Sequence, residues 1–253
     1  MNQDKILELY EVFRVEQGIA LFLEDHIERL FYGADKAGIN LTFDFTTIEN
    51  YLKNILVREQ IKTGNVRLSV FFESATGNMT SFNAFPVPFN YPSQELCKQG
   101  ISCGLFFSER EHPEAKIANT QIRKQANELI KEKDYFEVLL VNHLGEITEG
   151  SRSNVFFILD QQLVTAPDHT VLPGIARKKT LQAAESLNIP VEFISLPYKE
   201  LKEAEAAFIT GTSPRILAIK NIESFNMKGD HPIIQQLTKG FYELVESYIN
   251  MRL

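Results

Sequence analysis

The stretch EGSRSNVFFILDQQLVTAPDHTVLPGIARKK, residues 149–179, decides the fold of this chain. Residues 154–159 form an apolar run of strand length, and residues 163–165 indicate a second strand beyond a polar turn. Gly174 follows a proline and precedes a helical pattern. Glycine allows a ligand to approach the backbone closely, and the N–H groups of a helix start favour an anion. The carboxylate of Glu149, at the beginning of the stretch, and the helix start after Gly174 therefore suit a ligand with a basic end and a phosphate end. Packing alone explains the pattern equally well, because a lone glycine before a helix is common.

Composition and charge narrow the class of protein. The chain has 253 residues, 44% of them hydrophobic and 23% charged, so it is long enough for a sizeable core in one or two domains. A net charge of −7 argues against a nucleic-acid surface. No apolar run is long enough to cross a membrane, and the N-terminus lacks the features of a signal peptide. Two cysteines and five scattered histidines show no metal-site spacing, so we expect a cytoplasmic protein without a metal.

The first third of the sequence predicts a small α/β domain. Residues 9–15 and 19–23 flank a Gln-Gly turn and indicate a hairpin. Helices are expected from residue 24 or 25 to residue 38 and over residues 46–59, and strands over residues 65–73 and 81–87. The proline-rich stretch 86–92 interrupts these patterns. We therefore expect a small domain over 1–87, a linker over 88–94 and a larger domain over 95–253.

The larger domain is also expected to be α/β. Its predicted strands are residues 101–107, 138–141, 191–196 and 206–209, and its predicted helical segments are residues 175–187, 197–205 and 232–249. The charged run 131–134 is expected to be the solvated end of a helix, and the triplet Arg177-Lys178-Lys179 to be mostly solvated. The fold class is therefore α/β, with α+β character and two domains.

The opening stretch resembles the signature of the class IV aminotransferases, the fold-type IV enzymes that use pyridoxal 5′-phosphate. That family includes D-amino-acid aminotransferase, branched-chain aminotransferase and aminodeoxychorismate lyase. The matching elements are Glu149, Ser151 and Asn154 followed by Val155 and Phe156, then Leu163-Val164-Thr165, and finally Leu172-Pro173-Gly174-Ile175-Ala176-Arg177. The resemblance implies a D-amino-acid aminotransferase-like fold with the cofactor in the cleft between two domains. It also implies a homodimer, small-molecule amino acid and keto acid substrates, and transfer of an amino group between them.

The resemblance also selects a catalytic lysine. A primary amine is required because the family forms an imine between a lysine and the cofactor aldehyde. Composition alone leaves Lys116, Lys124, Lys131 and Lys133 open. The family's lysine precedes its glutamate at a similar spacing and is soon followed by an asparagine. Lys116 lies 33 residues before the glutamate of the signature and three before Asn119, so it meets both conditions.

The remaining cofactor contacts are also implied by the resemblance. Glu149 is expected to hold a proton on the pyridine nitrogen, and Asn154 to line the ring. The phosphate is expected to bind the helix start, a hydroxyl-rich turn and an arginine of the first domain, which are Gly174, Ile175 and Ala176, then Thr212 and Ser213, and Arg29. Without the resemblance, the position of Arg29 beside the apolar stripe of a helix would favour an ordinary solvent-exposed arginine.

Three residues are candidates for substrate binding. Tyr10 matches the tyrosine that faces the substrate in D-amino-acid aminotransferase, although a strand tyrosine is more often part of a core. Arg67 is a candidate for binding a carboxylate, and a solvent-facing arginine at the edge of a strand is an equally good explanation. Arg215 stands where relatives carry a glutamate, and we expect it to contact an acidic substrate or a partner subunit.

Two departures from the family leave the substrate open. The Phe71–Ser74 segment stands where D-specific relatives and the lyase carry an Arg-Gly motif, and the chain begins close to Tyr10, where relatives usually have a further strand. The main alternative is therefore an aminodeoxychorismate lyase, which eliminates pyruvate. A non-catalytic relative is a remote alternative, because a scaffold needs neither Lys116 nor Glu149. A dinucleotide-binding fold is disfavoured, because no G-x-G-x-x-G follows a strand.

Overall fold

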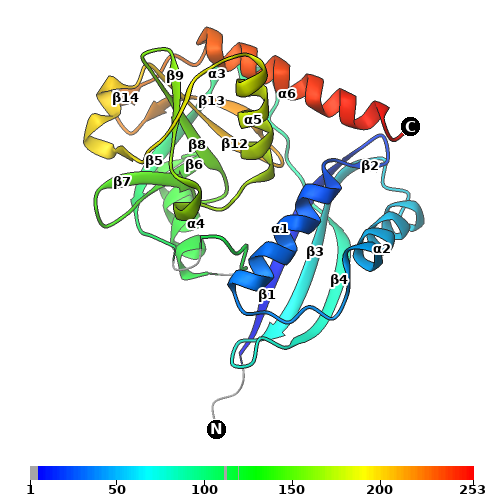
Figure 1. The fold of residues 1–253 in the computed structure, drawn as a ribbon. Helices are drawn as coiled ribbons and strands as arrows, with labels where there is room; N and C mark the ends of the chain where they lie inside the picture. The colour runs from blue at the N-terminus through cyan, green and yellow to red at the C-terminus, as the bar shows by residue number, and fades with distance from the viewer. Residues whose placement is uncertain (1–4, 111–112, 119) are drawn as a thin grey trace. The chain divides into compact units, whose positions relative to one another are not determined.

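Figure 1 shows the computed structural model of the chain, which describes residues 5–110, 113–118 and 120–253. Asn119, expected near the catalytic lysine, lies outside the described residues. The chain divides into two compact units. Unit 1 contains the residues up to Asn90 together with Glu114–Ala118 and Val245–Leu253, and unit 2 contains the rest. The predicted boundaries at 87 and 95 stay predictions, because the segment 114–118 is grouped with the N-terminal residues.

Unit 1 is built on a four-stranded antiparallel sheet with the order β2-β1-β3-β4. The strands are β1 (Ile6–Glu16), β2 (Ile19–Ala20), β3 (Thr63–Glu73) and β4 (Met79–Val87). Helix α1 (Leu23–Lys36) packs on β1 and helix α2 (Phe45–Arg58) on β4. The predicted hairpin, helices and strands are all present, and β4 continues through Pro86, where the proline-rich interruption was predicted to begin.

Strand β1 shows why this sequence forms a two-faced strand. Residues alternate between the faces of a strand, and here Leu9, Phe13 and Val15 point into the core with the carboxylate of Glu11. The even-numbered residues, among them Tyr10, lie on the opposite face and are only partly buried. Consequently one strand supplies both the apolar core of unit 1 and a polar face.

Helix α1 begins without a side-chain cap from its own sequence. Its N-cap residue Phe22 has a left-handed φ of 55°, and the Tyr248 hydroxyl accepts the N–H of Leu23 at 2.9 Å instead. The same hydroxyl donates to Glu24 at 2.6 Å. A residue more than two hundred positions away therefore caps this helix, which explains why sequence pattern alone placed its start one or two residues late.

Unit 2 is built on a ten-stranded sheet. Nine strands follow the order β10-β9-β8-β12-β13-β5-β6-β7-β11, and the tenth, β14, pairs with β13. Its strands are β5 (Ile101–Phe107), β6 (Glu137–Val141), β7 (Glu146–Gly150), β8 (Asn154–Leu159), β9 (Gln162–Thr165), β10 (Val191–Phe193), β11 (Leu196–Pro197), β12 (Ala206–Gly211), β13 (Arg215–Ile222) and β14 (Phe225–Asn226). Its helices are α3 (Gln94–Gln99), α4 (Gln121–Lys133), α5 (Ile175–Ser186) and α6 (Pro232–Asn250), with short 3₁₀ turns at Asp168–Thr170 and Tyr198–Glu203. The last residues of α6 are grouped with unit 1.

Two predictions for this unit need correction. The strand expected over 191–196 is two strands, β10 and β11, which pair with β9 and β7 near opposite ends of the sheet. Only two residues separate Phe193 from Leu196, so the ends of the two strands are at most about 11 Å apart and the sheet must curl until its ends are close. The helix expected over 197–205 is a 3₁₀ turn. The strand β13 was not predicted, and it lies in the centre of the sheet.

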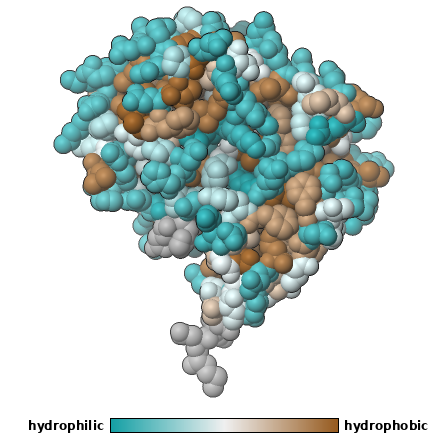
Figure 2. Space-filling model, in the orientation of Figure 1, coloured by the Kyte–Doolittle hydropathy of each residue, from teal (hydrophilic) through white to brown (hydrophobic). Residues whose placement is uncertain are grey.

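The surface is consistent with a fold that buries most of its apolar residues. Most of the face in Figure 2 is hydrophilic, and the apolar residues gather in separate patches. Each unit has its own hydrophobic cluster, around Phe13 and Leu68 in unit 1 and around Phe157 and Leu217 in unit 2. Among the described residues, no helix combines the length and apolarity needed to cross a bilayer.

Replacing a core residue of β1 tests this account of unit 1. Phe13 is fully buried, so we expect Phe13→Ala to reduce the free energy of unfolding by about 3–5 kcal/mol. The matched control is Val57→Ala, because Val57 is 79% exposed on α2 and should change it by less than about 0.5 kcal/mol. Urea unfolding monitored by circular dichroism measures both. Equal effects of the two substitutions would contradict the assignment of the core.

Candidate active site

The lysine selected from the sequence lies along the edge of strand β1. Tyr10 N–H donates to the Lys116 carbonyl at 3.0 Å, and Ala118 N–H donates to the Glu8 carbonyl at 2.8 Å. An isolated antiparallel bridge joins Leu9 and Ile117 between these two bonds. The segment Glu114–Ala118 therefore behaves as a short extra strand. It fixes the backbone of Lys116 beside the polar face of β1.

The Tyr10 ring gathers two cations on that face. The Lys116 ammonium lies 4.9 Å from the ring centroid, and the Arg67 guanidinium carbon lies 3.8 Å from it. A cation above an aromatic ring is attracted by the ring quadrupole. The structure thus brings together Lys116, Tyr10 and Arg67, three residues that were predicted from separate parts of the sequence.

The fourth predicted residue of this unit, Arg29, is held by a buried carboxylate. Glu11 accepts hydrogen bonds from Arg29 Nε at 2.8 Å and Nη2 at 2.5 Å, and its second oxygen lies 2.7 Å from His26 Nδ1. Burial alone raises the pKa of the Glu11 carboxyl, but the charge of Arg29 and the hydrogen bonds from His26 and Arg29 outweigh it and hold that pKa at about 2. The expectation of a solvated arginine is therefore wrong, because Arg29 is buried.

His26 supports the same pair in its neutral form. Burial lowers the pKa of the His26 imidazole, although the Glu11 carboxylate opposes that shift. Glu11 can only accept while it is ionised, so the Nδ1 atom of His26 carries the proton and donates it. The carboxylate of Glu11 is therefore fixed by two residues of α1, and it in turn fixes the orientation of Arg29.

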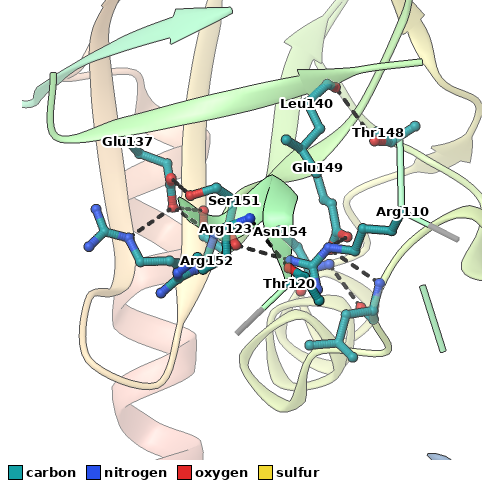
Figure 3. A network of polar contacts seen from close by, with 12 residues as sticks. Arg110, Thr120, Arg123, Glu137, Leu140, Thr148, Glu149, Ser151, Arg152 and Asn154 are labelled. Carbon is teal, nitrogen blue, oxygen red and sulfur yellow. Dashed lines mark hydrogen bonds and ion pairs between the residues drawn. The ribbon is translucent and has the colours of Figure 1, made fainter. Parts of the chain in front are cut away.

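In unit 2 the predicted glutamate forms the centre of a second polar network. Glu149 is buried in β7, with 2% of its side chain exposed. Figure 3 shows its carboxylate between Arg110 and the backbone of the segment before α5. Arg110 Nε lies 2.9 Å from one oxygen, and Leu172 N–H donates to the other at 3.1 Å. A guanidinium and a backbone N–H both favour the ionised form of a carboxyl group.

Asn154 links this carboxylate to the helix start. Its amide donates to the Leu172 carbonyl at 2.9 Å, so Leu172 bonds to Glu149 through its N–H and to Asn154 through its carbonyl. A Cβ atom on Gly174 would lie 2.0 Å from Asn154 Oδ1. Gly174 has φ −64° and is the N-cap of α5 without a side-chain cap. Glycine is therefore required by the close approach of Asn154 rather than by a special backbone angle.

Arg110 was not selected from the sequence, although it forms an ion pair with the predicted glutamate. It also donates to the Ser151 carbonyl at 3.0 Å, an oxygen that accepts from Arg123 as well at 2.6 Å. The Ser151 hydroxyl donates to the buried carboxylate of Glu137 at 2.7 Å (Figure 3). The only sequence signal for Arg110 was its position six residues before Lys116, and exposed arginines are common in such polar segments.

The remaining predicted residues lie around the β12–β13 turn and at the start of α5. Thr212 and Ser213 lie in that turn and are half-buried. Arg215 begins β13 with a left-handed φ of 56°, is buried, and places its guanidinium carbon 4.6 Å from the Tyr242 ring. Thr210 is the cross-strand partner of Asn154. The Thr210 hydroxyl is buried and has no hydrogen-bond partner among the residues that the structure describes.

The expectation for the basic triplet after Gly174 is wrong at one position. Arg177 is buried, and it donates to Asp168 at 2.5 Å and to the Ala166 carbonyl at 2.8 Å. Lys178 is exposed, as expected. Arg177 therefore fastens the first turn of α5 to the loop after β9. No group of three or more histidine, cysteine or acidic residues suits a metal ion within the described parts of the chain.

The buried ion pair gives a testable prediction for stability. Glu11→Gln leaves the buried Arg29 charge uncompensated, so we expect a loss of about 3–5 kcal/mol at pH 7. The folded pKa of Glu11, about 2, is below its ordinary value of 4.5, so its contribution is fully present above pH 4.5 and disappears as the pH falls toward 2. Urea unfolding at pH 7 and pH 3 should show the gap between wild type and variant narrowing.

The control for this prediction is Glu49→Gln. Glu49 pairs with Lys53 on the surface of α2, so its loss should cost less than about 0.5 kcal/mol. A cost below about 1 kcal/mol for Glu11→Gln at pH 7 would show that the pair does not hold Arg29.

Comparisons with known proteins agree with this geometry. Residues 8–222 match the sequence family described as amino-transferase class IV. The D-alanine aminotransferase of Bacillus licheniformis is 29% identical over 250 residues, covering 95% of this chain and 87% of that protein. Two solved structures show the same fold. The branched-chain amino acid aminotransferase of Escherichia coli has a TM-score of 0.83 at 20% identity, and the match covers 94% of this chain and 86% of that one.

The second structure is a Legionella pneumophila protein regarded as a candidate 4-amino-4-deoxychorismate lyase. Its TM-score is 0.82 at 20% identity, and the match covers 94% of this chain and 91% of that one. At these identities the structures speak for the fold alone, and they confirm the predicted fold class. The family match spans most of the sequence, including the polar strand β1 and both carboxylates, Glu11 and Glu149. This chain therefore belongs to the class IV aminotransferase family, a family of enzymes.

Proposed function

We propose that this protein is an aminotransferase that uses pyridoxal 5′-phosphate to move an amino group between an amino acid and a 2-keto acid. One observation carries the proposal most directly. The N–H of Leu172 donates to the buried Glu149 carboxylate, and Leu172 lies two residues before Gly174, the N-cap of α5. The pyridine nitrogen of the cofactor prefers a carboxylate, and its phosphate prefers a helix N-terminus.

The residues present fit this cofactor. Lys116 supplies the amine, Glu149 supplies a buried carboxylate, and the N–H groups of Ile175 and Ala176 begin a helix whose N-cap residue, Gly174, has no side chain to cap it. The buried Thr210 hydroxyl, which has no hydrogen-bond partner among the described residues, offers one more polar group next to Asn154.

The cofactor, when bound, supplies a carbonyl that captures amines and a ring that withdraws electrons. Lys116 would provide the amine that holds the cofactor and, once released, would act as the general base that moves a proton. Its backbone is fixed to β1 by Tyr10 N–H, so the side chain starts from a defined point. Glu149 would hold a proton on the ring nitrogen. Arg110 would orient the Glu149 carboxylate, because its Nε atom lies 2.9 Å from one oxygen.

The phosphate contacts form the second part of the proposal. We assign them to the N–H groups of Ile175 and Ala176, to Gly174 at the N-cap, to the turn residues Thr212 and Ser213, and to Arg29. Glu11 binds the Nε and Nη2 atoms of Arg29 and so fixes the orientation of the guanidinium group, which suits bidentate binding of a phosphate. The orientation of Arg29 is set before any ligand arrives, which reduces the entropy cost of binding.

Substrate binding is assigned to the face of β1 that carries Lys116. The Tyr10 ring contacts both the Lys116 ammonium and the Arg67 guanidinium, which supports a role for these three residues in binding the amino donor. Arg215 also stays a proposed substrate contact. Its stacking on Tyr242 supports a role in packing as well. We further propose a cytoplasmic homodimer, which rests on the resemblance and is tested by light scattering of the purified protein and by cell fractionation.

The lysine assignment is tested by removing it. Lys116→Ala should eliminate the visible absorbance band that pyridoxal 5′-phosphate acquires when a protein lysine binds it, because no amine remains at that point. The matched control is Lys124→Ala, since Lys124 is exposed on α4 and should leave the band unchanged. Circular dichroism verifies that both variants fold.

The outcomes of this test are distinct. A band that survives in Lys116→Ala would show that another lysine holds the cofactor. Incubating the wild type with alanine and a keto acid, and separately with aminodeoxychorismate, then separates transfer from elimination. Release of pyruvate and an aromatic amine, with no transfer in either hand of alanine, would favour the lyase over the aminotransferase.

A further inference from the structure

The polar face of strand β1 carries a carboxylate that the proposed reaction does not use. Glu8 lies two residues before Tyr10 on the same face, and its backbone carbonyl accepts the N–H of Ala118, two residues beyond Lys116. Its side chain is 15% exposed. A carboxylate so close to the lysine segment is in a position to influence which donors approach it.

Glu8 is engaged by the guanidinium that was expected to bind a substrate carboxylate. Arg67 Nε donates to Glu8 Oε1 at 2.9 Å, and Nη2 donates to the same oxygen at 2.7 Å. The Ser69 hydroxyl donates to that oxygen as well, at 2.5 Å. Arg67 thus directs two of its donors at an internal carboxylate. These charge-assisted bonds are only partly screened, because the Arg67 side chain is 23% exposed.

The sheet register explains why this contact crosses the substrate face. Arg67 is the cross-strand partner of Val12, whereas Glu8 lies four residues away along β1, about 13 Å at the rise of a strand. The Arg67 side chain therefore runs diagonally to reach Glu8. It passes over the ring of Tyr10, the residue between them on that face, at 3.8 Å. The ion pair lies across the tyrosine that also contacts Lys116.

We propose that Glu8 determines specificity by neutralising Arg67, so that the enzyme favours amino donors with uncharged side chains over donors with a second carboxylate. This inference rests on the proposed function and names its substrate class. The α-carboxylate is common to all donors and cancels in the comparison. A side-chain carboxylate next to the pair would be repelled by the negative charge of Glu8, while the Nε and Nη2 atoms of Arg67 already donate to Glu8. Like charges brought together in this way are strongly disfavoured.

The test removes the charge of Glu8 and keeps its shape. In Glu8→Gln the amide oxygen still accepts from Arg67 and Ser69, so the sheet should remain folded, while the guanidinium regains a net charge for a ligand. The holoenzyme is assayed with alanine and glutamate, each in both hands, using 2-oxobutyrate as acceptor. We expect the wild type to prefer alanine. Glu8→Gln should raise the glutamate-to-alanine ratio of kcat/KM by about tenfold or more.

Two further variants identify the cause of the change. Glu16→Gln is the matched control, because Glu16 lies on the same face of β1 and pairs with Arg14 at 2.6 Å, six residues from Tyr10. It should leave the ratio unchanged. Adding Arg67→Ala to Glu8→Gln should abolish the gain for glutamate, since the freed guanidinium is its source.

A binding measurement gives a readout that does not depend on turnover. Calorimetric titration of the holoenzyme with glutarate and butyrate should show tighter glutarate binding in Glu8→Gln and unchanged butyrate binding. If the wild type transfers amino groups and Glu8→Gln leaves the glutamate-to-alanine ratio of kcat/KM unchanged, this inference is overturned and the proposed function remains intact. No transfer from any donor would instead reject the proposed function, and unchanged glutarate binding in Glu8→Gln would still reject the role of Glu8.

Discussion

The buried ion pair between Glu11 and Arg29 is the interaction on which unit 1 depends. Two charges inside an apolar core are tolerated only when their hydrogen bonds are satisfied, and here His26 adds a third hydrogen bond to the carboxylate. Because residues alternate along β1, placing Glu11 in the core forces Tyr10 onto the opposite face. The backbone at Tyr10 then anchors Lys116. One strand therefore orients the proposed phosphate arginine, the lysine and the substrate face together.

Much of the fold followed from local pattern. The strands around Phe157 and the helix after Gly174 were predicted because apolar runs and a Pro-Gly break are local signals. The errors arose where distant residues decide the structure. The start of α1 depends on Tyr248, and the break between β10 and β11 depends on pairing with opposite parts of a curled sheet. Strand β13 was missed although residues 216–219 are an apolar run, which is a local signal for a strand.

The chemistry of the site was predictable only where a motif specified it. Lys116 and Glu149 were selected as candidates from spacing that the family shares, and both lie in hydrogen-bonded frameworks. The polar partners of the candidate residues were not selected from the sequence. Arg110 lies in the loop after β5 and contacts Glu149 in β7. Glu8 reaches Arg67 only because of the register of the antiparallel strands β1 and β3. Such partners are distant in sequence, so no local pattern indicates that they meet.

The measurement that tests the central claim most directly is reduction of the purified holoenzyme with borohydride, followed by peptide mass spectrometry. Reduction fixes the cofactor to the lysine that holds it, and the peptide that gains mass identifies that lysine. We predict that the pyridoxyl group is found on Lys116 alone, because its segment is the one bonded to β1 beside Tyr10 and Arg67. Modification of another lysine such as Lys124, or of none, would contradict the account of this active site.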